Sequence, residues 1–197
     1  MRLLADGPLL DAARGHYRQP HRFYHDVRHV DELIDLAGRH TPDLDDAEQL
    51  ALLFHDAVYV PGAPKGQNEA LSTTLMRATA FALAEDGAIP AIPAATLEDA
   101  AAIIVATTHA EPPPDRAARI CDLDLWRLAA PWRAFLAHGE DIRREYRFLH
   151  ASDEAFWTAR HAFYRSMLDK PALFATRRFR DGFEPAARDN LRQALLL

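Results

Sequence analysis

Imidazoles and carboxylates stand along this chain at spacings that could bind a metal ion. His25 and His29 are four residues apart, so a helix over this segment would place both on one face. His55 and Asp56 follow the apolar run 50–54 and precede a loop rich in proline and glycine. Burying the Asp56 carboxylate without a partner would be costly, and a divalent cation would supply the missing positive charge. The side chains of adjacent helical residues point about 100° apart. His55 and Asp56 could therefore bind one ion together only at the end of a helix, and that is where the sequence places them.

A plainer interpretation stays open for each of these residues. His55 could cap the C-terminus of its helix, where positive charge is favoured. Asp56 could bond to the loop that follows. His25 and His29 could belong to a partly exposed polar face with no ligand at all.

Two further carboxylates, Asp122 and Asp124, lie among apolar residues at 120–128. Asp122 suits the N-cap of a helix, which leaves Asp124 as the more inward group. Two imidazoles and two carboxylates suit Mn²⁺, Fe²⁺, Zn²⁺, Ni²⁺ or Mg²⁺. With a divalent ion, two carboxylates bring the total charge of such a site to zero.

Helices must position these groups, because apolar residues recur at helical spacing along almost the whole chain. Alternation typical of β-strands is missing, and no connector resembles a domain linker. The pattern predicts a single all-α domain over residues 1–197 with about eight or nine helices. One helix should begin near Phe23 and end at 41–43. Thr96 should cap another, and Pro185 should stand in the first turn of the last helix, which runs to Leu197.

Composition narrows the function classes. The 197 residues carry a net charge of −6, which argues against a protein that coats nucleic acid. The single cysteine, Cys121, excludes a disulfide framework within the chain and a cysteine-rich zinc site. Apolar stretches fall short of the roughly 20 residues that a membrane span needs, and residues 1–10 do not read as a signal-peptide core. We therefore expect a cytoplasmic protein with no membrane partner.

The spacing of these groups resembles that of the HD superfamily of metal-dependent phosphohydrolases. His29, the pair His55-Asp56 and Asp124 reproduce its H…HD…D signature. Longer motifs resemble one bacterial subgroup of predicted phosphohydrolases, including F-H-D-x-V-Y and D-x-D-L, although Asp26 stands where that subgroup often has Asn. The resemblance spans about residues 17–197. The matching segments are 20–30, 54–59, 68–72, 106–109, 122–125, 142–146 and 184–191.

The resemblance implies an all-α HD bundle with one divalent ion, of Mn, Fe, Ni, Zn, Co or Mg, in a central cleft. It implies His29, His55, Asp56 and Asp124 as ligands, with Asp56 and His55 as the catalytic pair and Asp56 handling the attacking water. Some HD proteins hold two metals through extra histidines between the HD pair and the last aspartate. Here His109 is the only histidine in that interval, which favours one metal and disfavours a di-iron oxygenase.

Several residues could contact the substrate. Lys65 could equally be a solvated loop charge, and Arg28 could be a surface partner of Asp31 or Glu32. Glu69 could fix a ligand histidine, or simply be an acid favoured in the first turn of a helix. The substrate-binding residues that we predict are His25, Arg28, Lys65, Glu69 and His109.

We therefore expect an enzyme, a metal-dependent phosphohydrolase acting on a small phosphate ester, with a nucleotide as the favoured substrate. The alternative is a non-catalytic nucleotide-binding or interaction module that retains the fold. Aromatic residues gather in the C-terminal half, where they could form core, a base-stacking wall or the face of a homodimer.

Overall fold

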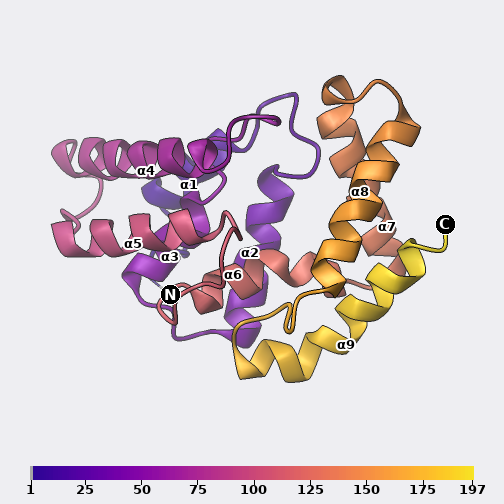
Figure 1. Cartoon of the computed structure of the whole chain (residues 1–197). Helices are drawn as coiled ribbons and strands as arrows, with labels where there is room; N and C mark the ends of the chain where they lie inside the picture. Colours follow the sequence, from indigo (N-terminus) through magenta and orange to yellow (C-terminus); the bar gives the residue numbers. More distant parts are fainter. Residues whose placement is uncertain (1) are drawn as a thin grey trace.

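The computed structural model describes residues 2–197, and within that range every regular element is helical (Figure 1). The predicted all-α class is confirmed, and nine α-helices match the predicted eight or nine. None of the described helices is long and apolar enough to cross a membrane. The elements are α1 (Pro8–His16), α2 (Val27–His40), α3 (Asp46–Phe54), α4 (Gln67–Glu85), α5 (Ala94–Ala106), α6 (Ala118–Leu125), α7 (Trp132–Tyr146), α8 (Asp153–Leu168) and α9 (Arg177–Ala194), with short 3-10 helices at Trp126–Ala129 and Arg147–Leu149.

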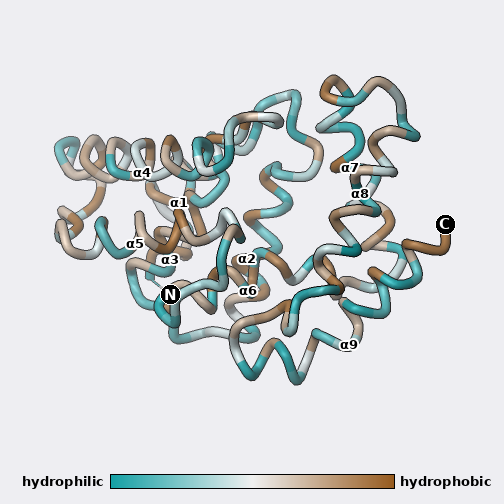
Figure 2. The backbone as a smooth tube through the Cα atoms, in the orientation of Figure 1, coloured by the Kyte–Doolittle hydropathy of each residue, from teal (hydrophilic) through white to brown (hydrophobic). Residues whose placement is uncertain are grey.

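The helices form two groups with α2 and α6 between them. Figure 1 shows α1, α3, α4 and α5 on one side and α7, α8 and α9 on the other. One connected cluster of buried apolar side chains draws members from all nine helices. Figure 2 shows hydrophilic and hydrophobic residues interspersed along the outer helices α4 and α9, as expected of helices that turn one face to the core.

Three predicted helix starts are wrong: side chains other than the expected ones cap α2 and α9, and α5 begins directly after a proline without a side-chain cap. α2 begins at Val27, not near Phe23, since Asp26 has extended backbone and its carboxylate accepts from the backbone N–H of Arg28 at 2.9 Å. α5 begins at Ala94, directly after Pro93, so Thr96 lies inside the helix.

The last helix, α9, begins eight residues before Pro185. Thr176 caps it by accepting from the backbone N–H of Phe179, so Pro185 lies inside the helix and not in its first turn. A proline there removes the hydrogen bond to the carbonyl of Asp181. Both residues are exposed, so water can satisfy that carbonyl and the helix continues to Ala194.

Helix α3 is the most buried element and carries the His55-Asp56 pair at its end. Every residue from Ala47 to Phe54 is buried, on all faces of the helix. Asp45 and Glu48 form a capping box at its start. This burial puts the C-terminal end of α3 in the middle of the molecule, so side chains that follow it face the interior.

Two side chains hold the backbone where α3 ends. The Tyr17 hydroxyl donates to the Leu53 carbonyl at 3.0 Å and accepts from the Asp56 backbone N–H at 3.3 Å. The buried Arg22 guanidinium donates to the carbonyls of Asp56 and Ala57 at 2.6 and 2.8 Å. Arg22 therefore satisfies buried carbonyls that α3 itself leaves without a partner.

We expect Arg22→Leu to lower the free energy of unfolding by roughly 2–4 kcal/mol, because buried carbonyls would lose their charged donor. Urea denaturation followed by circular dichroism measures this loss. The matched control is Arg18→Leu, since Arg18 is exposed. A loss no larger than that of the control would show that Arg22 does not stabilise this turn.

Candidate metal centre

Four side chains from three separate parts of the fold converge beside the end of α3. His29 comes from the first turn of α2, His55 and Asp56 follow α3, and Asp124 lies on α6. Each offers one nitrogen or oxygen atom, and these atoms all lie within 4.8 Å of one another. The Nε2 atoms of His29 and His55 are 3.1 Å apart. These residues could hold a metal ion.

The carboxylates approach the same two nitrogen atoms. Asp124 Oδ1 lies 3.3 Å from His29 Nε2 and 3.5 Å from His55 Nε2. Asp56 Oδ2 lies 3.2 Å from His55 Nε2 and 3.7 Å from His29 Nε2. Two nitrogen and two oxygen donors facing one point are a donor set that suits a divalent transition ion.

The tautomer of His55 follows from its second hydrogen bond. His55 is the C-cap residue of α3, and its Nδ1 lies 3.0 Å from the carbonyl oxygen of Leu52. A carbonyl can only accept, so Nδ1 carries a proton, and in the neutral ring Nε2 presents its lone pair to the cluster. His55 therefore stands at the C-cap of α3, contacts the helix through Nδ1 and faces the cluster through Nε2, so the two alternatives left open by the sequence do not exclude each other.

His29 is also suited to bind through Nε2. Burial, together with the positive charge of Arg127, lowers the pKa of His29 to about 4, so its ring is neutral at pH 7. A neutral imidazole is the form that binds a metal ion. Its buried Nδ1 has no hydrogen-bond partner among residues 2–197.

His55 attracts the two carboxylates, Asp56 and Asp124. Burial acts to raise the pKa of Asp56, but the positive charges of His55 and His25 outweigh it and lower the pKa to about 2. Burial opposes protonation of His55, and the two carboxylates overcome it and raise the pKa of His55 well above its usual value. A cation bound here would replace that proton, so metal binding should be weaker at low pH.

His109 supports Asp124 and stands outside the four-residue cluster. Its Nε2 lies 2.9 Å from Asp124 Oδ2, whereas His29 and His55 lie nearest to the other carboxylate oxygen, Oδ1. His109 has a φ of 49°, an uncommon left-handed conformation for a residue with a side chain. The turn after α5 thus aims His109 at the carboxylate and orients it.

Asp122 and Asp124 differ from the prediction in both their role and their burial. Asp122 caps no helix of its own: it lies within α6 and accepts from the backbone N–H groups of Ala175 and Thr176 at 2.6 and 2.8 Å. It is also the more inward of the two, with 1% of the residue exposed against 18% of the Asp124 side chain. Asp122 holds the segment before α9, while Asp124 reaches the cluster.

His25 does not share a helical face with His29, because α2 begins two residues after it. Glu145 on α7 holds it instead. Glu145 Oε2 accepts from the backbone N–H groups of Phe23, Tyr24 and His25 at 2.8, 2.8 and 3.1 Å. Its other oxygen lies 2.5 Å from His25 Nδ1. Sequence reasoning gave Glu145 no role, although it falls within the matching segment 142–146.

A cavity of about 630 Å³ opens beside the cluster. Asp56 and Asp124 line it, together with three of the predicted substrate-binding residues, His25, Glu69 and His109. Burial, with the nearby negative charges of the two aspartates, raises the pKa of Glu69, and its own backbone N–H acts in the opposite direction.

The other two predicted substrate-binding residues do not line this cavity. Lys65 is exposed in the loop before α4. Arg28 is exposed, and it donates to Asp26 and to the carbonyl of Phe23, both at 2.7 Å. The cavity is lined instead by two basic residues that sequence reasoning did not select, Arg160 and Lys170.

No protein-family model, curated protein or solved structure matches this chain. The functional assignment therefore depends on the geometry of the cluster and its cavity.

We expect the purified protein to bind about one divalent transition ion per chain, more tightly than millimolar, through His29, His55, Asp56 and Asp124. Isothermal titration with Mn²⁺ and Ni²⁺ gives the stoichiometry and affinity. His29→Ala should weaken binding by roughly tenfold or more. His161→Ala, a histidine outside the cluster, should leave it unchanged. Two ions per chain, or equal affinity in both variants, would contradict the prediction.

Glu145 makes a pH-dependent contribution to stability. Burial acts to raise its pKa, but His25 and the backbone N–H groups lower it from 4.5 to about 2. A carboxylate with a lowered pKa in the folded protein stabilises it above its unfolded pKa, and this contribution is lost as the pH falls from 4.5 toward 2.

Glu145→Gln should therefore lower the free energy of unfolding by roughly 1–3 kcal/mol at pH 7 and by less at pH 3. Urea denaturation at the two pH values measures the difference. Glu154→Gln, an exposed residue in the following helix, is the control. A destabilisation that does not shrink in acid would rule out the charged carboxylate as its cause.

Proposed function

We propose that this protein is a metal-dependent phosphohydrolase of the HD type, which acts on a small phosphate ester with a nucleotide as the favoured substrate. The observation that carries the proposal is the convergence of His29, His55, Asp56 and Asp124 on one point at the wall of a cavity of about 630 Å³. A cavity of this size accommodates a ligand as large as a nucleotide.

The donor set fits a single divalent ion of Mn, Fe, Ni, Zn, Co or Mg, because neutral imidazoles and ionised carboxylates are ligands that such ions accept. When bound, the ion would polarise a phosphoryl oxygen and lower the pKa of a water molecule. His29 and His55 would hold it through Nε2, and Asp124 through Oδ1. His109 would keep Asp124 in the required orientation through the other carboxylate oxygen.

Asp56 is the group best placed to orient the attacking water and to accept its proton. It lines the cavity, and Tyr17 and Arg22 hold its backbone in place. A carboxylate ionised at pH 7 can serve as a general base. His55 is its partner, with Nε2 at 3.2 Å from the Asp56 oxygen.

His25 is positioned to contact the phosphoryl group. Glu145 can only accept, so His25 Nδ1 carries a proton and the other edge of the ring remains available to a substrate oxygen. The ring stacks on Tyr59 with centroids 3.6 Å apart, which fixes its plane at the cavity wall. His25 thus acts as a substrate-binding residue and not as a metal ligand.

Hydrolysis of 4-nitrophenyl phosphate by the Mn²⁺-loaded protein, followed by a panel of nucleotides, tests the proposal. Turnover that depends on added metal supports the phosphohydrolase. Nucleotide binding without turnover would overturn it and favour the alternative, a non-catalytic nucleotide-binding module.

Asp56→Ala should reduce the rate at saturating Mn²⁺ by about three orders of magnitude or more, because it removes a ligand and the base together. The fold should persist, since Asp56 is not part of the apolar core; circular dichroism and the melting temperature verify this. Asp115→Ala, an exposed aspartate outside the cavity, is the control. Retained activity in Asp56→Ala would disprove the catalytic assignment, whatever its melting temperature.

A further inference from the structure

Two basic side chains line the cavity that also contains Asp56 and Asp124. Arg160 lies on α8 and Lys170 follows the end of that helix. Within residues 2–197 neither forms an ion pair, whereas the buried Arg127 pairs with Glu32 and the partly buried Arg188 with Glu184. Cations without an acidic partner, facing a cavity in a protein of net charge −6, call for an anionic ligand.

The contacts of Arg160 leave its donors available. Its guanidinium lies over the rings of Phe163 and Tyr164, 4.6 and 4.9 Å from their centroids. Such stacking uses the face of the guanidinium and leaves the N–H groups at its edge free. The Nε of Arg160 is buried and has no acceptor in the described part of the chain. A buried donor without an acceptor is unfavourable, so an acceptor from a ligand would stabilise this arrangement.

The charge of Arg160 and the charges of the cluster carboxylates influence the same two tyrosines, Tyr24 and Tyr146. Burial raises the pKa of Tyr24, where Asp124 acts in the same direction and Arg160 in the opposite one. Burial also raises the pKa of Tyr146, where Asp56 acts in the same direction and Arg160 in the opposite one. Both tyrosines line the cavity, so the cluster carboxylates and Arg160 act on the same part of its wall.

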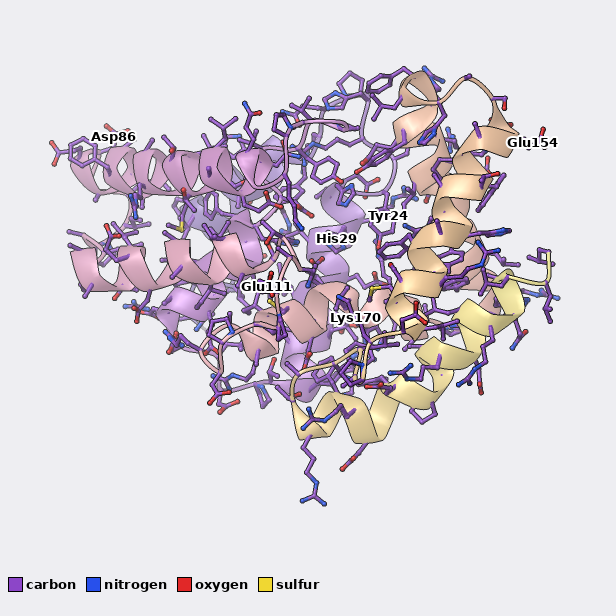
Figure 3. All side chains as sticks on the ribbon, in the orientation of Figure 1. Tyr24, His29, Asp86, Glu111, Glu154 and Lys170 are labelled. Atoms are coloured by element: carbon purple, nitrogen blue, oxygen red, sulfur yellow. The ribbon has the colours of Figure 1, made fainter. Side chains whose placement is uncertain are left out.

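Lys170 supplies the second positive charge. Figure 3 shows it between α6 and the C-terminal end of α8, apart from His29. Lys170 also lines the neighbouring depression that Pro171 and Arg180 border. Its backbone is anchored, because its carbonyl accepts from Arg188 at 2.8 Å.

Apolar side chains also line the cavity, so the body of a bound molecule could lie against hydrocarbon. They come from α6 to α8 and the 3-10 helix after α6: Leu125, Leu128, Ile142, Phe156 and Met167.

We propose that Arg160 and Lys170 form a second anion-binding subsite, so that the small phosphate ester, whether a nucleotide or not, carries a second anionic group, a carboxylate or a phosphate, in addition to the phosphoryl group at the cluster. This inference rests on the proposed function, which places the first phosphoryl group at the His/Asp cluster. Each basic residue can give the second group a charge-assisted hydrogen bond.

The test compares non-hydrolysable ligands that differ only in the second group. Phenylphosphonate has one anionic group, 4-carboxyphenylphosphonate and benzene-1,4-diphosphonate have two, and 4-carbamoylphenylphosphonate is the uncharged isostere. Isothermal titration against the Mn²⁺-loaded protein should show roughly tenfold or tighter binding of at least one doubly anionic ligand relative to phenylphosphonate and the isostere. Which of the two binds more tightly distinguishes a carboxylate from a phosphate.

Arg160→Gln and Lys170→Gln should each remove most of this preference and leave the affinity for phenylphosphonate nearly unchanged. Arg165→Gln is the matched control, because Arg165 is exposed on the same helix and lies outside the cavity. Lys170 lies beyond the end of α8, so Lys170→Gln does not alter that helix. This variant still tests the subsite if Arg160→Gln does not fold.

Equal affinity for all four ligands, no binding of any of them, or a preference that survives in both variants would overturn the subsite. The hydrolysis assay reports separately on the proposed function. A charge preference that Arg160→Gln abolishes, in a protein without turnover, would leave the subsite standing and remove the phosphohydrolase. Turnover of 4-nitrophenyl phosphate without any preference for doubly anionic ligands would support the phosphohydrolase and overturn the subsite.

Discussion

The structure depends on the burial of two carboxylates beside two imidazoles where α2, α3 and α6 meet. Asp56 and Asp124 would repel each other in the interior, and the charge and hydrogen bonds of the histidines offset that repulsion. Such an arrangement tolerates little displacement, because unpaired buried charge is costly. The backbone around it is accordingly held by buried polar side chains, Tyr17 and Arg22, in addition to helical hydrogen bonds.

Two other buried carboxylates tie distant segments of the chain to the frame of the site. Glu145 gathers three backbone N–H groups ahead of α2, and Asp122 gathers two ahead of α9. Each accepts hydrogen bonds from backbone N–H groups of the segment just before a helix, which are not paired within that helix. Through Glu145, α7 also sets the position of His25, so the second group of helices takes part in shaping the cavity wall.

Different helices supply the acidic and the basic residues that line the cavity. The chain up to the end of α6 contributes Asp56, Asp124, His25 and His109 to its lining, and α8 with the residue after its end contributes Arg160 and Lys170. Apolar side chains from α6 to α8 complete the lining. With a divalent ion at the cluster, the ligand that we propose would be negatively charged both at the ion and at Arg160 and Lys170.

The amino-acid sequence by itself determined the helical class, because the periodicity of apolar residues records which positions face inward. The order of its motifs, through the family resemblance, selected the four residues that the structure brings together in the cluster. It misplaced His25 and reversed the burial of Asp122 and Asp124, and it favoured Lys65 and Arg28 over Arg160 and Lys170 as basic residues of the site. Those outcomes depend on partners such as Glu145, which is 120 residues away from His25. Local spacing carries no information on such partners, so only the tertiary packing of α6, α7 and α8 against the end of α3 decided which charges face the cavity.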